Sequence, residues 1–166
     1  MNLLTAASAV DGRVVGGDAV FEQVVTDTRK LHGGELFIAL QGDRFDGQDF
    51  VEEAKRSGAV AVMSNRQVEI DLPTLVVDDT IRSLGQLASF WREHFDIPMV
   101  AVTGSNGKTT VREMIARIME VSKPTLVAEA NFNNHIGLPL TLLKLRDSHG
   151  YGVVEMGMNH PGEIAY

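Results

Sequence analysis

The chain has 166 residues, of which 44% are hydrophobic and 22% charged, a composition that is typical of globular proteins and excludes a disordered or fibrous one. A formal net charge of −7 argues against broad, charge-driven binding to nucleic acid or to an anionic membrane. The lack of cysteine excludes disulfides, thiolate metal sites and cysteine nucleophiles. The sequence has no secretory signal pattern and no run as long as a membrane span, so we expect a cytoplasmic protein without membrane insertion.

Residues 1–96 are expected to form a small α/β domain. Apolar runs predict buried strands, and an amphipathic stretch between them predicts a helix that ends at Gly58. The strands are expected at residues 36–40, 59–63 and 74–77, and the helix at 48–57. A longer amphipathic helix follows, capped by Asp79 or Thr80, with Trp91 as a core residue on its apolar face.

Residues 97–166 are expected to open a second domain, because Pro98 ends the helical pattern and begins a new apolar strand. Further strands are expected at 125–128 and 152–156, and helices after residue 107 and around 138–145. Strands that alternate with helices predict a parallel sheet with helices on its faces. The roughly 70 residues after Pro98 are few for a complete nucleotide-binding α/β domain, so we expect a truncated one.

A glycine-rich loop joins the first strand of this second domain to its first helix. The loop comprises Gly104, Ser105, Asn106, Gly107, Lys108, Thr109 and Thr110. Backbone N–H groups at a helix start bind phosphate, Lys108 adds a positive charge, and the Thr109 hydroxyl suits Mg²⁺. The general phosphate-loop pattern puts its first glycine at position 102, which is valine here, so the loop is a variant.

A tight turn without a ligand is the alternative reading of this loop. The two glycines would then merely permit unusual backbone angles. A lysine at a helix N-terminus opposes the helix dipole, however, and an anion would explain its place. The helix that follows is expected to carry one apolar face, made of Val111, Met114, Ile115 and Ile118.

Glu155 lies near the carboxyl end of the last expected strand, inside an apolar run. Ligands gather at this edge in open parallel sheets, and the glycine-rich loop lies there too. A carboxylate at this point can hold Mg²⁺ opposite Thr109, because Mg²⁺ prefers hard oxygen ligands. The alternative is a solvated acid at the end of a strand, which is unusual within an apolar run.

Two further polar segments are candidates for substrate binding. Asn133 and Asn134, next to a helix start, offer donors and acceptors, although loop asparagines also serve turn geometry. The neighbouring His135, like His160, is not expected to be catalytic, since a lone histidine is more often a surface residue. In the N-terminal part, Arg29 could pair with phosphate or simply be solvated at the surface.

Taken together, these stretches resemble the Mur ligases, ATP-dependent enzymes that extend the peptide of the cell-wall precursor. The resemblance covers nearly the whole chain, and several separate motifs occur in the right order. They are Thr-Gly-Ser-Asn-Gly-Lys-Thr-Thr at 103–110, residues 131–143, residues 155–164, Thr26-Asp27-Thr28-Arg29, and residues 34–40 followed by Phe45-Asp46-Gly47. Within the family, they are most similar to the ligases that add D-Ala-D-Ala to UDP-N-acetylmuramoyl-tripeptide in peptidoglycan synthesis.

The resemblance implies a function for each part of the chain. Residues 1–96 would be the domain that receives the UDP-sugar end of the substrate, and residues 97–166 the first part of the central ATP-binding domain. The loop 104–110 would hold the ATP phosphates, and Thr109 with Glu155 would hold Mg²⁺. The family's chemistry implies that an acyl phosphate forms on the tripeptide carboxylate and is attacked by the amine of D-Ala-D-Ala, with Lys108 and Glu155 as the catalytic residues.

The resemblance also implies the substrate contacts. They would come from Thr28, Arg29, Gly42, Asp46 and Gly47 on the UDP-sugar side, and from Asn133 and Asn134 on the peptide side. Mur ligases have three domains, so we expect this chain to be incomplete and unable to ligate alone. The full-length form is expected to be monomeric.

Two alternatives remain open from the sequence. The first is another ligase of the same superfamily, similar to MurE or to folylpolyglutamate synthase, which would share the phosphate loop. The second is a non-catalytic module that binds a UDP-sugar and retains a vestigial loop.

Overall fold

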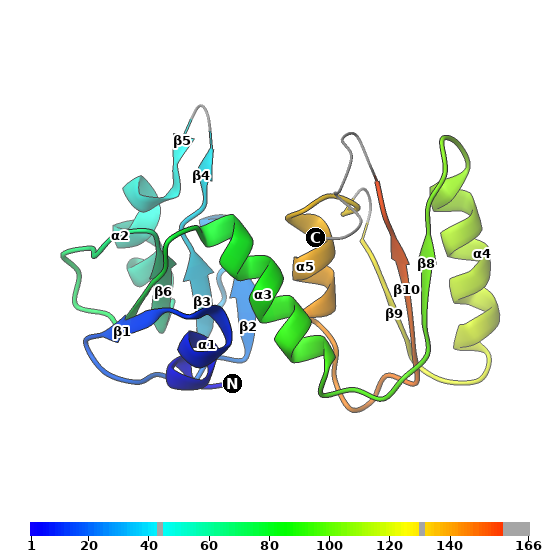
Figure 1. Ribbon diagram of the computed structural model, residues 1–166, viewed down its shortest axis with the longest axis horizontal. Coiled ribbons are helices and arrows are strands. Elements are labelled where there is room, and N and C mark those ends of the chain that lie inside the picture. Colours follow the sequence, from blue (N-terminus) through cyan, green and yellow to red (C-terminus); the bar gives the residue numbers. More distant parts are fainter. Residues whose placement is uncertain (43–44, 130–131, 158–166) are drawn as a thin grey trace. The chain divides into compact units, whose positions relative to one another are not determined.

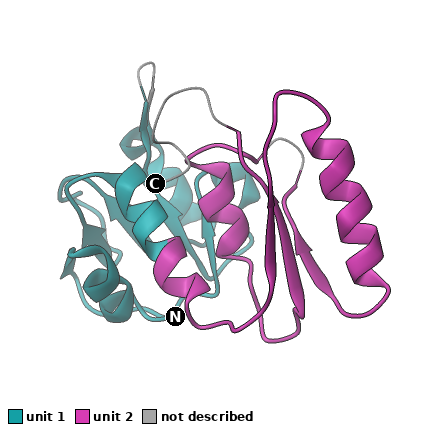
Figure 2. Ribbon diagram, turned by 45° about the vertical axis from the view of Figure 1, so that its right-hand side comes forward, with its two compact units in different colours: residues 1–87 teal, residues 88–166 magenta. Residues whose placement is uncertain are grey.

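The computed structural model describes residues 1–42, 45–129 and 132–157, which form two compact units, residues 1–87 and 88–166 (Figures 1 and 2). The expected α/β fold class is confirmed in both units. None of the helices in the described part of the chain is long and apolar enough to cross a membrane.

Unit 1 is built on a five-stranded sheet in the order β1-β7-β6-β3-β2. The strands are β1 (Arg13–Val15), β2 (Gln23–Val25), β3 (Glu35–Ile38), β6 (Ala61–Ser64) and β7 (Thr74–Val76). Only the pair β1–β7 is antiparallel among the described pairs of this sheet. The remaining elements are α1 (Leu3–Val10), the 3-10 turns Thr28–Lys30 and Gly47–Phe50, the hairpin β4 (Gln41–Gly42) and β5 (Phe45–Asp46), α2 (Val51–Arg56) and α3 (Thr80–Arg92).

The central strands of unit 1 follow the apolar runs of the sequence, because all residues of β3 and β6 are buried. The short strands β1 and β2 and the hairpin β4–β5 were not predicted, since three-residue or shorter segments carry little periodicity. The helix predicted at 48–57 starts as a 3-10 turn and becomes α2 only at Val51. Asp79 is the cap of α3, with Oδ1 accepting from the N–H groups of Ile81 (2.8 Å) and Arg82 (3.0 Å).

Unit 2 contains a parallel three-stranded sheet in the order β8-β10-β9, with α4 on one face and α5 on the other (Figures 1 and 2). The elements are β8 (Met99–Val102), α4 (Lys108–Glu120), β9 (Thr125–Val127), α5 (Gly137–Leu142) and β10 (Tyr151–Glu155). The core between α4 and the sheet centres on the buried residues Val102, Ala116 and Val153. The register places Glu155 of β10 opposite Val102 of β8, so both strands end at the same edge.

The boundary between the two compact units falls within α3, between Leu87 and Ala88. The last turn of α3 belongs to unit 2. Trp91 packs against the cluster of Phe95 and Leu145 in unit 2, and its Nε1 donates to the carbonyl of Leu145 at 3.1 Å. Trp91 is therefore partly buried and packs against the core of unit 2, whereas the sequence predicts a core residue.

Most of the apolar face expected on α4 does not pack against the sheet. Of its four residues, Ile115 is partly buried and packs against the cluster of Val102, Ala116 and Val153, whereas the other three are exposed. Val111, Met114 and Ile118 are 45%, 62% and 73% exposed. The helix instead buries Arg112 and Ala116 against the sheet. The small side chain of Ala116 lets the helix approach the strands closely. Arg112 pairs there with the carboxylate of Glu155, and the hydropathy of the helix does not indicate this pairing.

Candidate functional site

The glycine-rich loop leaves β8 at Val102 and enters α4 at Lys108. Gly104 has φ +150° and Gly107 has φ +75°, a region of backbone space that favours glycine. Gly107 stands at the N-cap of α4 and no side chain caps this helix start. The first N–H groups of a helix have no partner within the helix, so this end offers donors to an anion.

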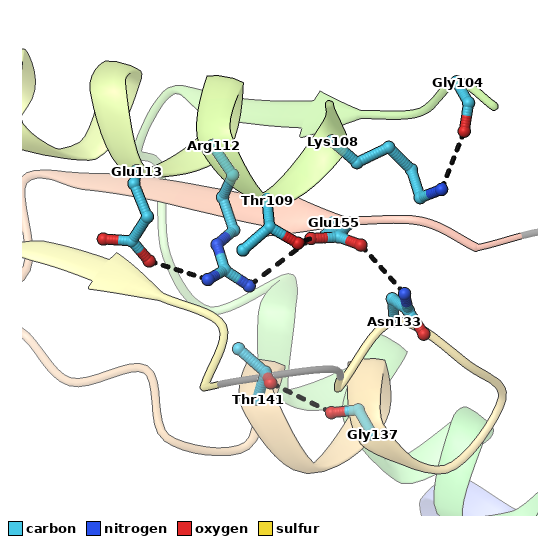
Figure 3. Close-up of polar contacts among 9 residues, drawn as sticks. All are labelled: Gly104, Lys108, Thr109, Arg112, Glu113, Asn133, Gly137, Thr141 and Glu155. Carbon is cyan, nitrogen blue, oxygen red and sulfur yellow. Dashed lines mark hydrogen bonds and ion pairs between the residues drawn. The ribbon is translucent and has the colours of Figure 1, made fainter. Parts of the chain in front are cut away.

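Lys108 extends along the loop, and its Nζ donates to the carbonyl oxygen of Gly104 at 2.7 Å (Figure 3). The ammonium therefore lies beside the loop that leads into the N-terminus of α4. The positive charge and the helix dipole act together on a negatively charged ligand at this point.

Glu155 is the acidic group of the site, and it is 2% exposed (Figure 3). Its Oε2 accepts a hydrogen bond from the Thr109 hydroxyl at 2.9 Å, and its Oε1 accepts from Nδ2 of Asn133 at 2.8 Å. Nη1 of Arg112 lies 3.5 Å from Oε2. The structure thus brings together three of the predicted residues, Thr109, Asn133 and Glu155, from three different elements.

The strand pairing explains how Glu155 reaches the loop. The N–H of Met156 donates to the carbonyl of Val102 at 2.9 Å, which ties the end of β10 to the end of β8. The N–H of Gly157 donates to the carbonyl of Asn133 at 2.7 Å and holds the neighbouring loop in place. A solvated strand-end acid, the alternative reading of Glu155, does not fit its burial.

Arg112 was not predicted as a site residue. It is a buried cation, with its side chain 3% exposed, and its Nη2 donates to Oε1 of Glu113 at 2.7 Å. A polar residue in a helix usually faces solvent, so the sequence gives only a weak signal: Arg112 follows Thr109 by three positions, which places both on one side of a helix.

The second asparagine has a different environment from the first. Oδ1 of Asn134 accepts from the N–H groups of Ile136 (3.1 Å) and Gly137 (2.8 Å), so this side chain shapes the start of α5. Asn133 contacts Glu155, whereas Asn134 and His135 are exposed. His160 lies outside the described residues.

In unit 1, Thr28 and Arg29 lie together in one 3-10 turn. The Thr28 hydroxyl donates to Oε1 of Glu53 at 2.6 Å. Arg29 is exposed and pairs with Asp27 through two hydrogen bonds of 2.9 and 2.7 Å. The hydrogen bonds from Arg29 lower the pKa of Asp27 to about 2.

Gly42, Asp46 and Gly47 form a separate group around the β4–β5 hairpin. Oδ2 of Asp46 accepts from Arg66 at 3.1 Å. Gly47 packs so closely on the chain that a Cβ would lie 2.6 Å from the carbonyl oxygen of Leu40. Gly42 borders an open, mainly polar cavity of about 450 Å³, whose lining also includes Gln41, Asn65, Asp78, Asp79, Thr80 and Ile81.

The fold and the loop together define a class: an α/β protein with a glycine-rich strand-to-helix loop at the carboxyl edge of a parallel sheet. The sequence matches the Mur ligase family, catalytic domain, over residues 20–123, and the Mur ligase middle domain over residues 102–166. The chain therefore belongs to the Mur ligase family, and the expected resemblance is confirmed.

Several relatives share the name of one particular ligase within this family. The UDP-N-acetylmuramoyl-tripeptide–D-alanyl-D-alanine ligase of Escherichia coli (strain K12) is 47% identical over 95% of this chain and 35% of its own length. The ligase of the same name from Bacillus subtilis (strain 168) is 44% identical over 87% of this chain and 32% of its own. The chain thus spans about a third of the length of the curated relatives it matches.

Solved structures agree with these relatives. A crystal structure of MurF from Acinetobacter baumannii superposes with a TM-score of 0.90 at 37% identity, covering 98% of this chain and 36% of that one. MurF ligase from Thermotoga maritima in complex with ADP has a TM-score of 0.76 at 34% identity, covering 86% of this chain and 34% of that one.

Proposed function

We propose that this chain corresponds to the matching third of an ATP-dependent ligase that adds D-Ala-D-Ala to UDP-N-acetylmuramoyl-tripeptide in peptidoglycan synthesis. The observation that carries the proposal is the contact between Thr109, at the start of α4, and the buried Glu155, directly behind a glycine-rich loop. Relatives that carry the name of this ligase match 86–100% of the chain. One solved relative holds ADP, which supports a nucleotide in this site.

The loop 104–110 would bind the phosphates of ATP. Its N–H groups at the start of α4 and the ammonium of Lys108 supply the donors and the charge. Since phosphoryl transfer depends on positioning and on neutralising charge, these groups would act catalytically by holding the transferred phosphate.

Thr109 and Glu155 fit a Mg²⁺ ion by their chemistry. Both offer hard oxygen atoms, and these lie 2.9 Å apart at the mouth of the loop. Mg²⁺ usually takes one or two protein oxygens and completes its shell with water and phosphate oxygens. When bound, the ion would supply neutralisation of the phosphate charge.

Unit 1 would receive the UDP-sugar through the residues predicted for it, Thr28, Arg29, Gly42, Asp46 and Gly47. Of these residues, Gly42 lines the polar cavity, which supports its assignment because polar groups suit the hydroxyls of a sugar. Asn133 and Asn134 would contact the peptidyl part. In the proposed reaction, the tripeptide carboxylate would take the γ-phosphoryl group of ATP to form an acyl phosphate and release ADP. The D-Ala-D-Ala amine would then attack the acyl carbon, forming the amide bond and releasing inorganic phosphate. Cytoplasmic location and a monomeric full-length form belong to the same proposal, and light scattering of the longer protein tests the second.

Titration calorimetry on the chain tests the two halves of the proposal separately. Mg·ATP should bind, and Lys108→Ala should weaken it about 10- to 100-fold, because a charge-assisted contact to phosphate is lost. Arg117→Ala, on the exposed side of the same helix, is the matched control and should leave the affinity unchanged. UDP-N-acetylmuramoyl-tripeptide should bind independently of ATP.

The outcomes of these titrations distinguish the proposed ligase from a non-catalytic module that binds a UDP-sugar. UDP-sugar binding without any ATP binding would contradict the nucleotide site and favour the non-catalytic module. With ATP, Mg²⁺ and both substrates, the chain should release no phosphate above background, because it spans only about a third of its relatives. Substrate-dependent phosphate release would contradict that last expectation.

A further inference from the structure

Arg112 is a cation that α4 carries into the interior of unit 2. Its side chain is 3% exposed, and Nη1 and Nη2 reach two carboxylates, Glu155 at 3.5 Å and Glu113 at 2.7 Å. Burying a guanidinium is costly unless carboxylates and hydrogen bonds offset the lost hydration. The helix therefore places a fixed charge where β10 ends.

Glu155 is held by donors from two sides (Figure 3). Helix α4 supplies the Thr109 hydroxyl and the Arg112 guanidinium, both on Oε2, and the loop before α5 supplies the amide of Asn133 on Oε1. A glutamate side chain has several rotatable bonds, so each contact restricts where its carboxylate lies. The guanidinium is the one cationic partner among these three, and its ion pair with Oε2 at 3.5 Å is buried, where a low dielectric strengthens the attraction between opposite charges.

Lys108 and Arg112 lie on the same helix, but their side chains contact different parts of the site. Nζ of Lys108 contacts the loop carbonyl of Gly104, on the phosphate side. Arg112 contacts Glu155, on the sheet side. Removing Lys108 would affect a bound phosphate directly, whereas removing Arg112 would act through Glu155.

We propose that Arg112 is a positioning residue, which holds the Glu155 carboxylate against the Thr109 hydroxyl and so keeps both oxygens placed for the Mg²⁺ of a bound nucleotide. This inference rests on the proposed nucleotide site. It assigns Arg112 no contact with the nucleotide. Its loss therefore weakens the contribution of Mg²⁺ to nucleotide binding and leaves metal-free binding unchanged.

Three variants separate positioning from a general structural effect. Arg112→Met removes the charge and keeps most of the length, and Arg112→Lys keeps the charge but lacks the planar fork. Arg117→Met is the control: it removes a cation from the exposed side of α4, where Arg117 pairs with Glu120 at 3.1 Å.

The first readout needs no ligand. The side-chain amide signals of Asn133 in ¹H–¹⁵N spectra report the hydrogen bond to Glu155, and Asn133→Asp assigns them by their loss. Arg112→Met should shift or broaden these signals, and Arg112→Lys should shift them less. Arg117→Met should leave them unchanged. A folded Arg112→Met variant with wild-type Asn133 signals would overturn the proposal.

The second readout is the affinity for a fluorescent ADP analogue, measured in Mg²⁺ and again in EDTA. The ratio of the two dissociation constants is the gain due to the metal. Arg112→Met should reduce this gain about tenfold, the effect typical of residues that orient a metal ligand, with the EDTA value unchanged. Equal weakening in Mg²⁺ and in EDTA would overturn the positioning role.

Two further outcomes are decisive. If Arg112→Met does not fold, Arg112→Lys decides: a smaller metal gain supports the proposal, and a wild-type gain together with wild-type Asn133 signals overturns it. If the wild-type chain shows no metal gain, the proposed metal site fails. The Asn133 signals then still decide whether Arg112 positions Glu155.

Discussion

Replacing Glu155 by glutamine removes one charge from the buried cluster and changes its shape little. Glu155 accepts from Thr109 and Asn133 and lies beside the Arg112 guanidinium. A glutamine has one acceptor oxygen, so its NH₂ group must face a donor from Asn133 or from the α4 side. The substitution therefore costs one hydrogen bond and leaves Arg112 with less neutralising charge.

The size of the effect follows from these contacts. Removing one partner of a buried ion pair typically costs about 3–5 kcal/mol. Arg112 keeps Glu113, and the glutamine oxygen still accepts one hydrogen bond, so we expect about 2–3 kcal/mol for unit 2. With a urea m-value of about 1–2 kcal/mol/M, the midpoint should fall by about 1–3 M.

Trp91 makes the measurement specific to unit 2. It is the one tryptophan of the sequence, and it packs in the unit 2 cluster with Phe95 and Leu145. Urea unfolding followed by its fluorescence therefore reports this unit. Glu120→Gln, in a surface pair with Arg117, is the control and should change stability by less than about 0.5 kcal/mol. If Glu155→Gln unfolds at the same urea concentration as the wild type, the buried cluster does not contribute as reasoned.

Three other changes have expected outcomes. Gly47→Ala should destabilise unit 1 by about 1–3 kcal/mol in urea unfolding followed by circular dichroism, because its Cβ would meet backbone 2.6 Å away; an unchanged midpoint would contradict this packing. Arg29 lowers the pKa of Asp27 to about 2, so the ionised carboxylate stabilises the fold at pH values above its usual pKa of 3.8. This stabilisation is lost as the pH falls through about 2. Asp27→Asn should thus cost about 0.2–1 kcal/mol at pH 7 and almost nothing below pH 2, and an equal cost at both would refute the pairing. Ile118→Lys should change the Trp91-monitored midpoint by less than about 0.5 kcal/mol, because Ile118 is 73% exposed, whereas Ala116→Leu should cost about 1–3 kcal/mol; similar effects of the two would refute the observed packing of α4.

The glycine-rich strand-to-helix loop was predictable because its requirements are local. Gly104 and Gly107 supply the positive φ angles of a strand-to-helix turn, and Lys108 and Thr109 follow directly in the chain. The same holds for the buried strands β3 and β6, whose apolar runs are continuous. Family membership followed from the order of such local motifs.

The cluster around Glu155 needed the fold. Thr109, Asn133 and Glu155 are separated by 22 to 46 positions, and the tertiary structure brings them within hydrogen-bond distance. The parallel pairing of β10 with β8 places Glu155 beside the loop, and the hydrogen bond from Gly157 to the Asn133 carbonyl places Asn133. No periodicity in the sequence encodes that register. The sequence therefore placed Glu155 near the loop, and the structure decided which donors hold it.

By itself, the sequence determined the α/β class, the glycine-rich strand-to-helix loop and the family, because each depends on neighbouring residues. Only the tertiary structure decided which side of α4 packs. The helix has apolar residues around much of its circumference, and close approach to the sheet favours Ala116 over the larger Met114 and Ile118. The same packing brings Arg112 inward, where Glu155 offsets the cost of burying its charge.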